Sequence, residues 1–155
     1  MNLLPPPGRT PVLPPGRQRG ASLIEVLVAV IIMSVGLLGV AAMQSIALRN
    51  SQGSMERTQA VIQSYAMLDS MRANLTAARA GAYVMAETCS APAPGNLVET
   101  DKSMWIASLL ATVGPSACGA IQCGADDVCS IIVTWDDSRA SGGDDEHSIT
   151  TTSRL

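Results

Sequence analysis

One carboxylate stands alone in a long apolar run, and its position makes it the first candidate for chemistry. Glu25 is the only charged residue between Ala21 and Leu48. A carboxylate within a membrane costs roughly 2.5–3.5 kcal/mol on insertion scales, so it predicts either a cationic partner or a place at the wet interface. The run itself contains no cation. Cleavage after Gly20 would supply one, because it would leave a free amine on Ala21.

Four cysteines form the second candidate group. All of them lie in the second half of the chain: Cys89, Cys118, Cys123 and Cys129. Four cysteines in a small exported domain favour two disulfides, and three pairings are open; one of them would join Cys123 to Cys129 across a hairpin. Zinc is the alternative, but the spacing lacks a C-x2-C pair and the single histidine is distant. We therefore expect no metal and no cofactor.

Acidic residues near the C-terminus form the third group. Asp136 and Asp137 precede a Gly- and Ser-rich stretch, and three acids at residues 144–146 follow it. Such a loop could bind calcium, but it lacks EF-hand spacing, and acidic surface loops are common. His147 follows the loop and is expected to be solvated. No catalytic constellation is evident, so we expect the protein not to be an enzyme.

The rest of the sequence must position these residues, and its composition excludes several classes of protein. The 155 residues suffice for one modest domain, and only 15% are charged. Lys and Arg number 10 against 13 Asp and Glu, with four aromatic residues in all, which argues against a nucleic-acid-binding surface. Six of the nine prolines and three arginines lie before Gly20.

Residues 26–43 contain neither charge nor proline. As a helix they would span ~27 Å, close to the thickness of a bilayer. Arg17 and Arg19 precede the run, so the positive-inside rule places the N-terminus in the cytoplasm and the rest of the chain across the membrane. The alternative is a cleaved secretory signal with its site at residues 40–42, but the apolar core is too long for one.

Helical spacing continues beyond the apolar run. Residues 43–83 contain no proline, and the expected buried stripe consists of Val61, Tyr65, Leu68 and Leu75, with Met67 and Met71 beside it. A helix over residues 21–80 would be ~90 Å long. The alternative is a separate helix after a loop at residues 50–53.

The remainder predicts a small mixed domain. A helix should begin at Thr100–Asp101, bury Trp105, Leu109 and Val113, and end at Gly114–Pro115. Residues 129–135 form the clearest strand, with Cys129, Ile131, Val133 and Trp135 on one face. A turn at residues 124–127 should follow a short strand near Ile121, and residues 148–154 suit an edge strand. The expected fold class is α+β, with a long helix on a small antiparallel sheet.

Residues 17–30, Arg-Gln-Arg-Gly-Ala-Ser-Leu-Ile-Glu-Val-Leu-Val-Ala-Val, resemble the class III signal of type IV pilins and type II secretion pseudopilins. The resemblance implies that a membrane peptidase cuts after Gly20 and methylates the amine of Ala21. It also implies that Glu25 pairs with the N-terminus of a neighbouring subunit during assembly. Most members carry Phe where this chain has Ala21.

The globular part is similar to that of PilV minor pilins, through Asp-Lys-Ser-Met-Trp at residues 101–105 and Val-Thr-Trp-Asp-Asp at residues 133–137. The resemblance implies a cleaved leader (1–20), a transmembrane and filament-core helix (21–48), an amphipathic continuation (49–82) and a disulfide-stapled domain (83–155). It also implies a single-pass inner-membrane precursor with a periplasmic domain that later joins a pilus.

The implied role is to prime pilus assembly within a tip complex for adhesion or twitching motility. The implied partners are other minor pilins, the major pilin, the prepilin peptidase and the inner-membrane assembly platform. The alternatives are a type II secretion pseudopilin and a membrane-anchored periplasmic binding domain.

Overall fold

The computed structural model describes residues 20–140 and 142–155. Residues 1–19 of the expected leader therefore lie outside the described residues. The chain divides into two compact units, Met1–Val40 and Ala41–Leu155. Helix α1 (Leu23–Ala73) has 51 residues and contributes to both units. In the first unit every residue of α1 is exposed, and the most apolar 18-residue window of the helix has a mean hydropathy of 2.7.

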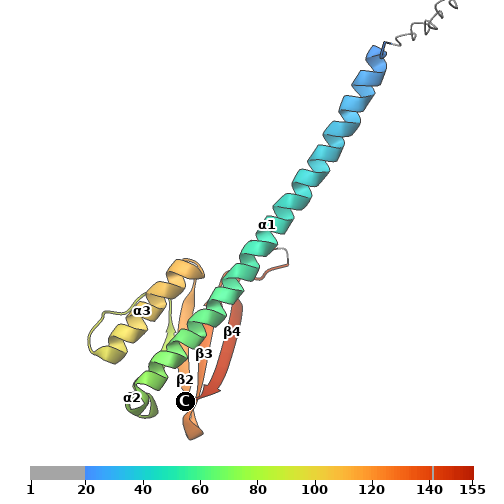
Figure 1. The fold of residues 1–155 in the computed structure, drawn as a ribbon. Helices are drawn as coiled ribbons and strands as arrows, with labels where there is room; N and C mark the ends of the chain where they lie inside the picture. Colours follow the sequence, from blue (N-terminus) through green and yellow to red (C-terminus); the bar gives the residue numbers. More distant parts are fainter. Residues whose placement is uncertain (1–19, 141) are drawn as a thin grey trace, which may run out of the picture. The chain divides into compact units, whose positions relative to one another are not determined.

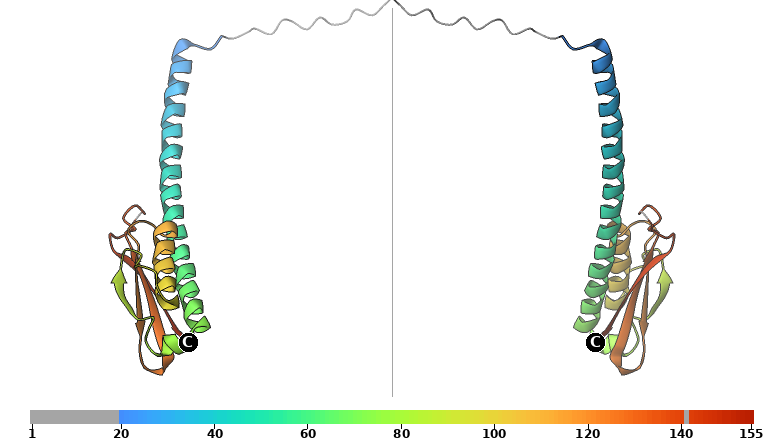
Figure 2. Two further views of the ribbon diagram at one scale, coloured as in Figure 1. Left: turned by 90° about the vertical axis from the view of Figure 1, so that its left-hand side faces the viewer. Right: turned by 90° about the vertical axis from the view of Figure 1, so that its right-hand side faces the viewer.

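In the second unit, the part of α1 that begins at Ala41 and a second helix, α3 (Leu97–Thr112), lie on one face of a sheet (Figures 1 and 2). The sheet has the order β1-β2-β3-β4, and every neighbouring pair is antiparallel. Its strands are β1 (Met85–Thr88), β2 (Cys118–Cys123), β3 (Val128–Trp135) and β4 (His147–Arg154). This arrangement confirms the α+β expectation, with β4 at an edge. The sequence missed β1, because Met, Ala and Glu are not typical strand residues.

The stripe by which α1 packs agrees with the expected one at Met67, Leu68 and Met71, which are buried, but differs from it at Val61 and Tyr65. Val61 is 36% exposed and Tyr65 is 52% exposed, whereas the buried positions of α1 are Gly53, Ala60, Ser64, Met67, Leu68 and Met71. The first three of these are small, so the helix backbone can approach its neighbours closely. A pattern search based on large apolar residues overlooks such positions, because the signal of burial is carried by small residues instead.

The ends of the helices also correct the expectations. Residues 50–53 are helical, so the alternative of a loop there is wrong. The long helix ends at Ala73 rather than at residue 80, because Asn74 leaves the helical conformation (φ −122°, ψ 53°) before the short helix α2 (Leu75–Arg79). Leu75 therefore lies in α2, where it is half-buried.

Helix α3 (Leu97–Thr112) begins three residues before the expected start at Thr100. The side chain of Asn96 accepts a hydrogen bond from the amide of Glu99, and the carboxylate of Glu99 accepts one from the amide of Asn96. This reciprocal pair is a capping box, which Thr100 and Asp101 do not form. The expected burial of Trp105, Leu109 and Val113 is confirmed.

The core lies between the two helices and the sheet. Cys129, Ile131, Val133 and Trp135 alternate with half-buried residues along β3 and face the helices, as the period of two predicts. A Cβ atom on Gly119 of β2 would lie 2.6 Å from the ring of Trp105, so only glycine lets α3 approach the strand this closely. The indole Nε1 of Trp105 donates to the carbonyl of Gln63 at 3.0 Å and links α3 to α1.

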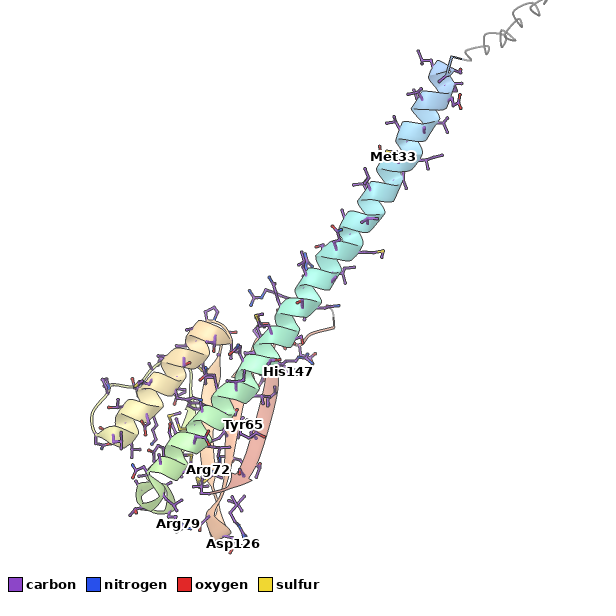
Figure 3. The ribbon with its side chains drawn as sticks, in the orientation of Figure 1. Met33, Tyr65, Arg72, Arg79, Asp126 and His147 are labelled. Carbon is purple, nitrogen blue, oxygen red and sulfur yellow. A yellow bond between two sulfur atoms is a disulfide. The ribbon has the colours of Figure 1, made fainter. Side chains whose placement is uncertain are left out.

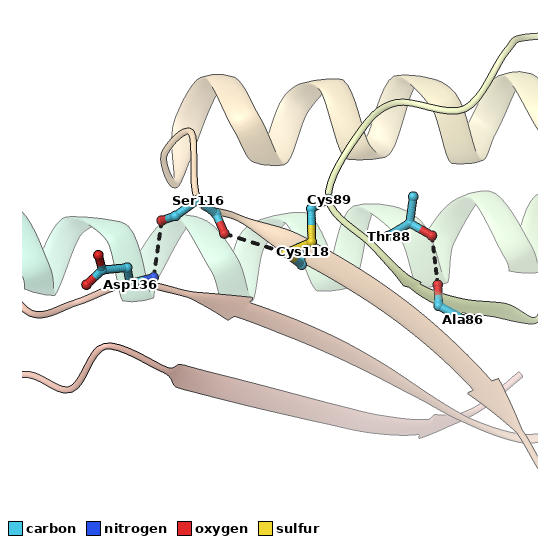
Figure 4. Close-up of a disulfide and its surroundings, with 6 residues drawn as sticks. All are labelled: Ala86, Thr88, Cys89, Ser116, Cys118 and Asp136. Atoms are coloured by element: carbon cyan, nitrogen blue, oxygen red, sulfur yellow. Dashed lines mark hydrogen bonds between the residues drawn. A yellow bond between two sulfur atoms is a disulfide. The ribbon is translucent and has the colours of Figure 1, made fainter.

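Two disulfides staple this unit, as expected for the fold. Cys89–Cys118 joins the segment after β1 to the start of β2 (Figure 4), and Cys123–Cys129 closes the β2–β3 hairpin. The loop that the first disulfide closes contains α3, because α3 lies between its two cysteines, which are 29 positions apart.

Candidate processing and assembly site

The candidate processing site lies immediately before α1. Gly20, Ala21 and Ser22 precede the helix, which begins at Leu23. The carbonyl of Ser22 accepts hydrogen bonds from the amides of Glu25 and Val26 at 3.0 and 3.2 Å. Glu25 consequently lies in the first helical turn, where a negative charge interacts favourably with the positive end of the helix dipole.

No contact within the described chain accounts for a glycine at position 20. A Cβ atom built there would meet nothing within 4 Å. Any requirement for Gly20 must therefore come from something that binds the segment, because a side chain there would not disturb the fold.

Glu25 differs from the residues around it. Leu23 and Ile24 are 83% and 64% exposed, and the following turns are apolar and exposed as well. Among the residues that the structure describes, no ion pair involves the Glu25 carboxylate. An apolar helix that carries one acid at its start can bring that carboxylate to a cation from outside the chain.

Residues 15–41 match the family model of the prokaryotic N-terminal methylation motif, the class III signal peptide of prepilin-like proteins. The match covers Gly20, Ala21 and Glu25. Comparisons with curated proteins and with solved structures gave no significant match. The motif and the apolar helix support a type IV pilin-like or pseudopilin protein, anchored in the membrane before assembly.

A second cluster fixes the loop between β3 and β4 to α1 and was not anticipated from the sequence. Arg57 donates through Nη2 to Oδ2 of Asp137 at 2.7 Å, and the Asp137 side chain is 1% exposed. A Cβ atom on Gly53 would lie 2.9 Å from Oδ1 of Asp137, so glycine permits this approach. The loop also contributes Arg139, whose Nη2 lies 3.4 Å from Oε1 of Glu56.

These contacts change the interpretation of the acidic loop. Asp137 was a candidate calcium ligand, but its carboxylate is buried in an ion pair with Arg57. Asp136 is exposed, and hydrogen bonds from Ser138 lower the pKa of its carboxyl. Among the described residues, no three acidic, histidine or cysteine side chains are grouped closely enough to hold a metal ion. The sequence offered only a weak indication of this ion pair, namely a glycine in the middle of the helix, Gly53, and the Asp136–Asp137 pair far along the chain.

A polar network ties α3 to the segment that enters β1. Tyr83 is fully buried, and its hydroxyl donates to Oδ2 of Asp101 at 2.6 Å. Burial raises the pKa of Tyr83, and the Asp101 carboxylate raises it further. Lys102 donates to the carbonyls of Ala82 and Val84 at 2.7 and 3.1 Å, and burial lowers the pKa of its amine. These hydrogen bonds hold α3 against the segment that leads into β1.

His147 does not lie in a solvated tail, contrary to the expectation. It begins β4, where it pairs with Trp135, and the two ring centroids are 4.9 Å apart in an edge-to-face arrangement. The indole Nε1 of Trp135 is buried and has no hydrogen-bond partner within the described part of the chain. The histidine packs against Trp135 at the end of the β3–β4 ladder where the loop between the two strands joins them.

Proposed function

We propose that this protein is a minor pilin of a type IV pilus, which helps to prime assembly and joins the tip complex. The observation that carries the proposal is the methylation motif, whose Gly20 and Ala21 immediately precede a 51-residue helix and whose Glu25 lies in its first turn. The α+β fold, with a long helix packed on a four-stranded antiparallel sheet and two disulfides, is pilin-like and supports the same function.

Processing would remove residues 1–20 and leave Ala21 with an N-methylated amine. The apolar segment up to residue 48 would first span the inner membrane and then enter the filament. An unpaired carboxylate is costly in a medium of low dielectric constant, whereas a matched ion pair is much less so. Pairing of Glu25 with the N-terminal ammonium of a neighbouring subunit would therefore favour docking and set the register of the new subunit.

The globular domain would lie in the periplasm before assembly and on the pilus afterwards. Its similarity to PilV minor pilins at residues 101–105 and 133–137 favours the pilus over a secretion pseudopilus. The partners would be other minor pilins, the major pilin, the prepilin peptidase and the assembly platform. A periplasmic binding domain on a membrane anchor is a weaker alternative, because Asp137 is unavailable as a ligand.

The test is the presence of the processed protein in surface filaments sheared from cells. The proposal expects a mature chain that begins at methylated Ala21 and co-sediments with pili, and a deletion strain that makes fewer pili. Intact pili together with a loss of secreted enzymes in that strain would instead identify a type II secretion pseudopilin. A mature chain that begins near residue 43 would refute both.

A further inference from the structure

The two edges of the sheet differ in a way that points to a docking site. Strand β1 has four residues and an irregular register with β2, and it ends next to the Cys89–Cys118 disulfide. Lys102 donates to the two carbonyls that lead into it. Short length, irregularity and a nearby lysine are the features by which proteins protect a sheet edge from further pairing.

Strand β4 has none of these features. It pairs with β3 in an unbroken register from His147 to Arg154, and it contains neither lysine nor proline. No strand lies beyond it in the part of the chain that the structure describes. Because alternate backbone amides and carbonyls of an edge strand point away from the sheet, β4 offers a row of unused hydrogen-bonding groups.

The side of α1 nearest this edge also carries apolar residues that the described chain leaves partly exposed. The guanidinium of Arg72 donates to Oγ of Ser153 on β4 at 2.8 Å, and this contact identifies the side of α1 nearest β4. Figure 3 labels Arg72 and Tyr65 on α1. Tyr65 lies seven residues earlier and Val61 eleven, so both share the flank of Arg72. They are the two residues that the helical pattern predicted to be buried and that are 52% and 36% exposed.

A fifth strand would pair with the open edge of β4 and would also cover Val61 and Tyr65. Strands in a sheet are spaced ~4.8 Å apart, so a strand beside β4 would lie beneath the flank that carries Val61 and Tyr65. Its backbone would pair with the open edge, and its inward side chains would cover the two exposed residues. Helix–sheet packing thus explains why two large apolar side chains are placed where the sheet ends.

We propose that β4 binds an extended segment of another polypeptide, which adds a fifth strand to the sheet. The segment should carry apolar residues at alternate positions, facing α1, and polar residues facing the hydroxyl groups of Ser148, Thr150 and Thr152 on the outer face. It should carry a basic residue near the acids at positions 144–146 and an acidic residue near Arg154. Binding of this kind takes its affinity from backbone hydrogen bonds and its specificity from alternate side chains.

The occupant is a different chain rather than a second copy. The β1 edge of a second copy is protected, and antiparallel pairing of two β4 strands would turn their α1 helices in opposite directions. Parallel pairing would turn the polar outer face of the second β4, with Ser148, Thr150 and Thr152, towards Val61 and Tyr65 and would leave them without an apolar cover. This part of the inference rests on the proposed function, because subunits of one filament share the direction of α1. The partner is then a neighbouring component of the pilus tip.

Hydrogen exchange on the full-length chain in detergent tests the edge directly. The probe is a ten-residue peptide of alternating Val and Thr, with Lys at one end and Glu at the other, N-methylated along one edge so that it cannot stack on itself. We expect saturable protection of the outward amides of β4. The matched variants are Tyr65→Lys and Ile62→Lys, since the two positions on α1 are 52% and 51% exposed. Tyr65→Lys should weaken binding at least tenfold, and Ile62→Lys less than threefold.

No protection of β4, or equal weakening by both variants, would overturn the proposal. Protection of β4 that rises with protein concentration in the absence of peptide would overturn it in favour of a second copy. In cells, Tyr65→Lys should be processed normally yet fall tenfold in sheared filaments relative to Ile62→Lys. Absence of the wild-type protein from filaments while the peptide still binds would refute the proposed function and leave the edge site standing, which separates the two failures.

Discussion

Removal of Arg57 should destabilise the globular unit more than removal of any other exposed arginine in an ion pair. Arg57→Met deletes the cation and leaves the Asp137 carboxylate buried at 1% exposure. A hydrogen bond to a charged group contributes ~1.5–3 kcal/mol. Because Arg57 itself is 49% exposed and partly screened by water, we expect the lower half of that range, ~1.5–2 kcal/mol.

The matched control is Arg79→Met. Arg79 lies 3.1 Å from Asp127, but both partners of this pair are substantially exposed, at 52% and 39%. Exposed pairs contribute ~0–1 kcal/mol, so this variant should barely change the free energy of unfolding.

The measurement is thermal unfolding of the full-length chain in detergent, followed by the near-ultraviolet signal of Trp105 and Trp135. A loss of 1 kcal/mol corresponds to roughly 4 °C in a domain of this size, so Arg57→Met should lower Tm by ~6–8 °C. Equal shifts for the two variants, or a shift below ~2 °C for Arg57→Met, would show that the buried carboxylate is stabilised by something other than Arg57.

Four further predictions concern processing, assembly, disulfides and pH. Gly20→Val should leave the full-length precursor in the membrane with unchanged Tm, because the side chain meets nothing within 4 Å; an intact mass lacking residues 1–20 would contradict this. Glu25→Val should be inserted and cleaved normally but lost from sheared filaments, and an equal ratio of filament to membrane protein in variant and wild type would place Glu25 in the wet interface. Cys118→Ser should destabilise the domain more than Cys123→Ser, ~3.5 against ~2 kcal/mol, because it opens a loop of 29 positions rather than 6; denaturant titration should show that order. The raised pKa of Tyr83 contributes stability that is complete below the pKa of the unfolded state, 10.0, and is lost as the pH rises through the pKa of the folded state. Tyr83→Phe should therefore lose less stability above pH 10 than wild type does. Identical dependence of the unfolding free energy on pH in the two proteins would contradict this.

Short-range features allowed the sequence to predict much of the molecule. The apolar run predicted an N-terminal helix long enough to cross a membrane, because hydropathy and the absence of proline act along one segment. The alternation of Cys129, Ile131, Val133 and Trp135 predicted β3 and its buried face, because a half-buried strand has a period of two. The candidate processing residues Gly20 and Ala21 were likewise proposed from a local pattern, and the methylation motif that matches residues 15–41 covers them.

Contacts between distant segments were decided only by the tertiary structure. Helical spacing predicted that Val61 and Tyr65 would be buried, but periodicity identifies a face without showing how far the sheet extends beneath it, and the sheet ends at β4. Asp137 looked like a surface acid until the fold placed it 2.7 Å from Arg57, eighty positions earlier. Gly53 carried no periodic signal because its role is to lack a side chain where Asp137 approaches. The sequence alone thus determined the helix, the main strand and the motif, whereas burial, ion pairing and the open sheet edge depended on which segments meet in space.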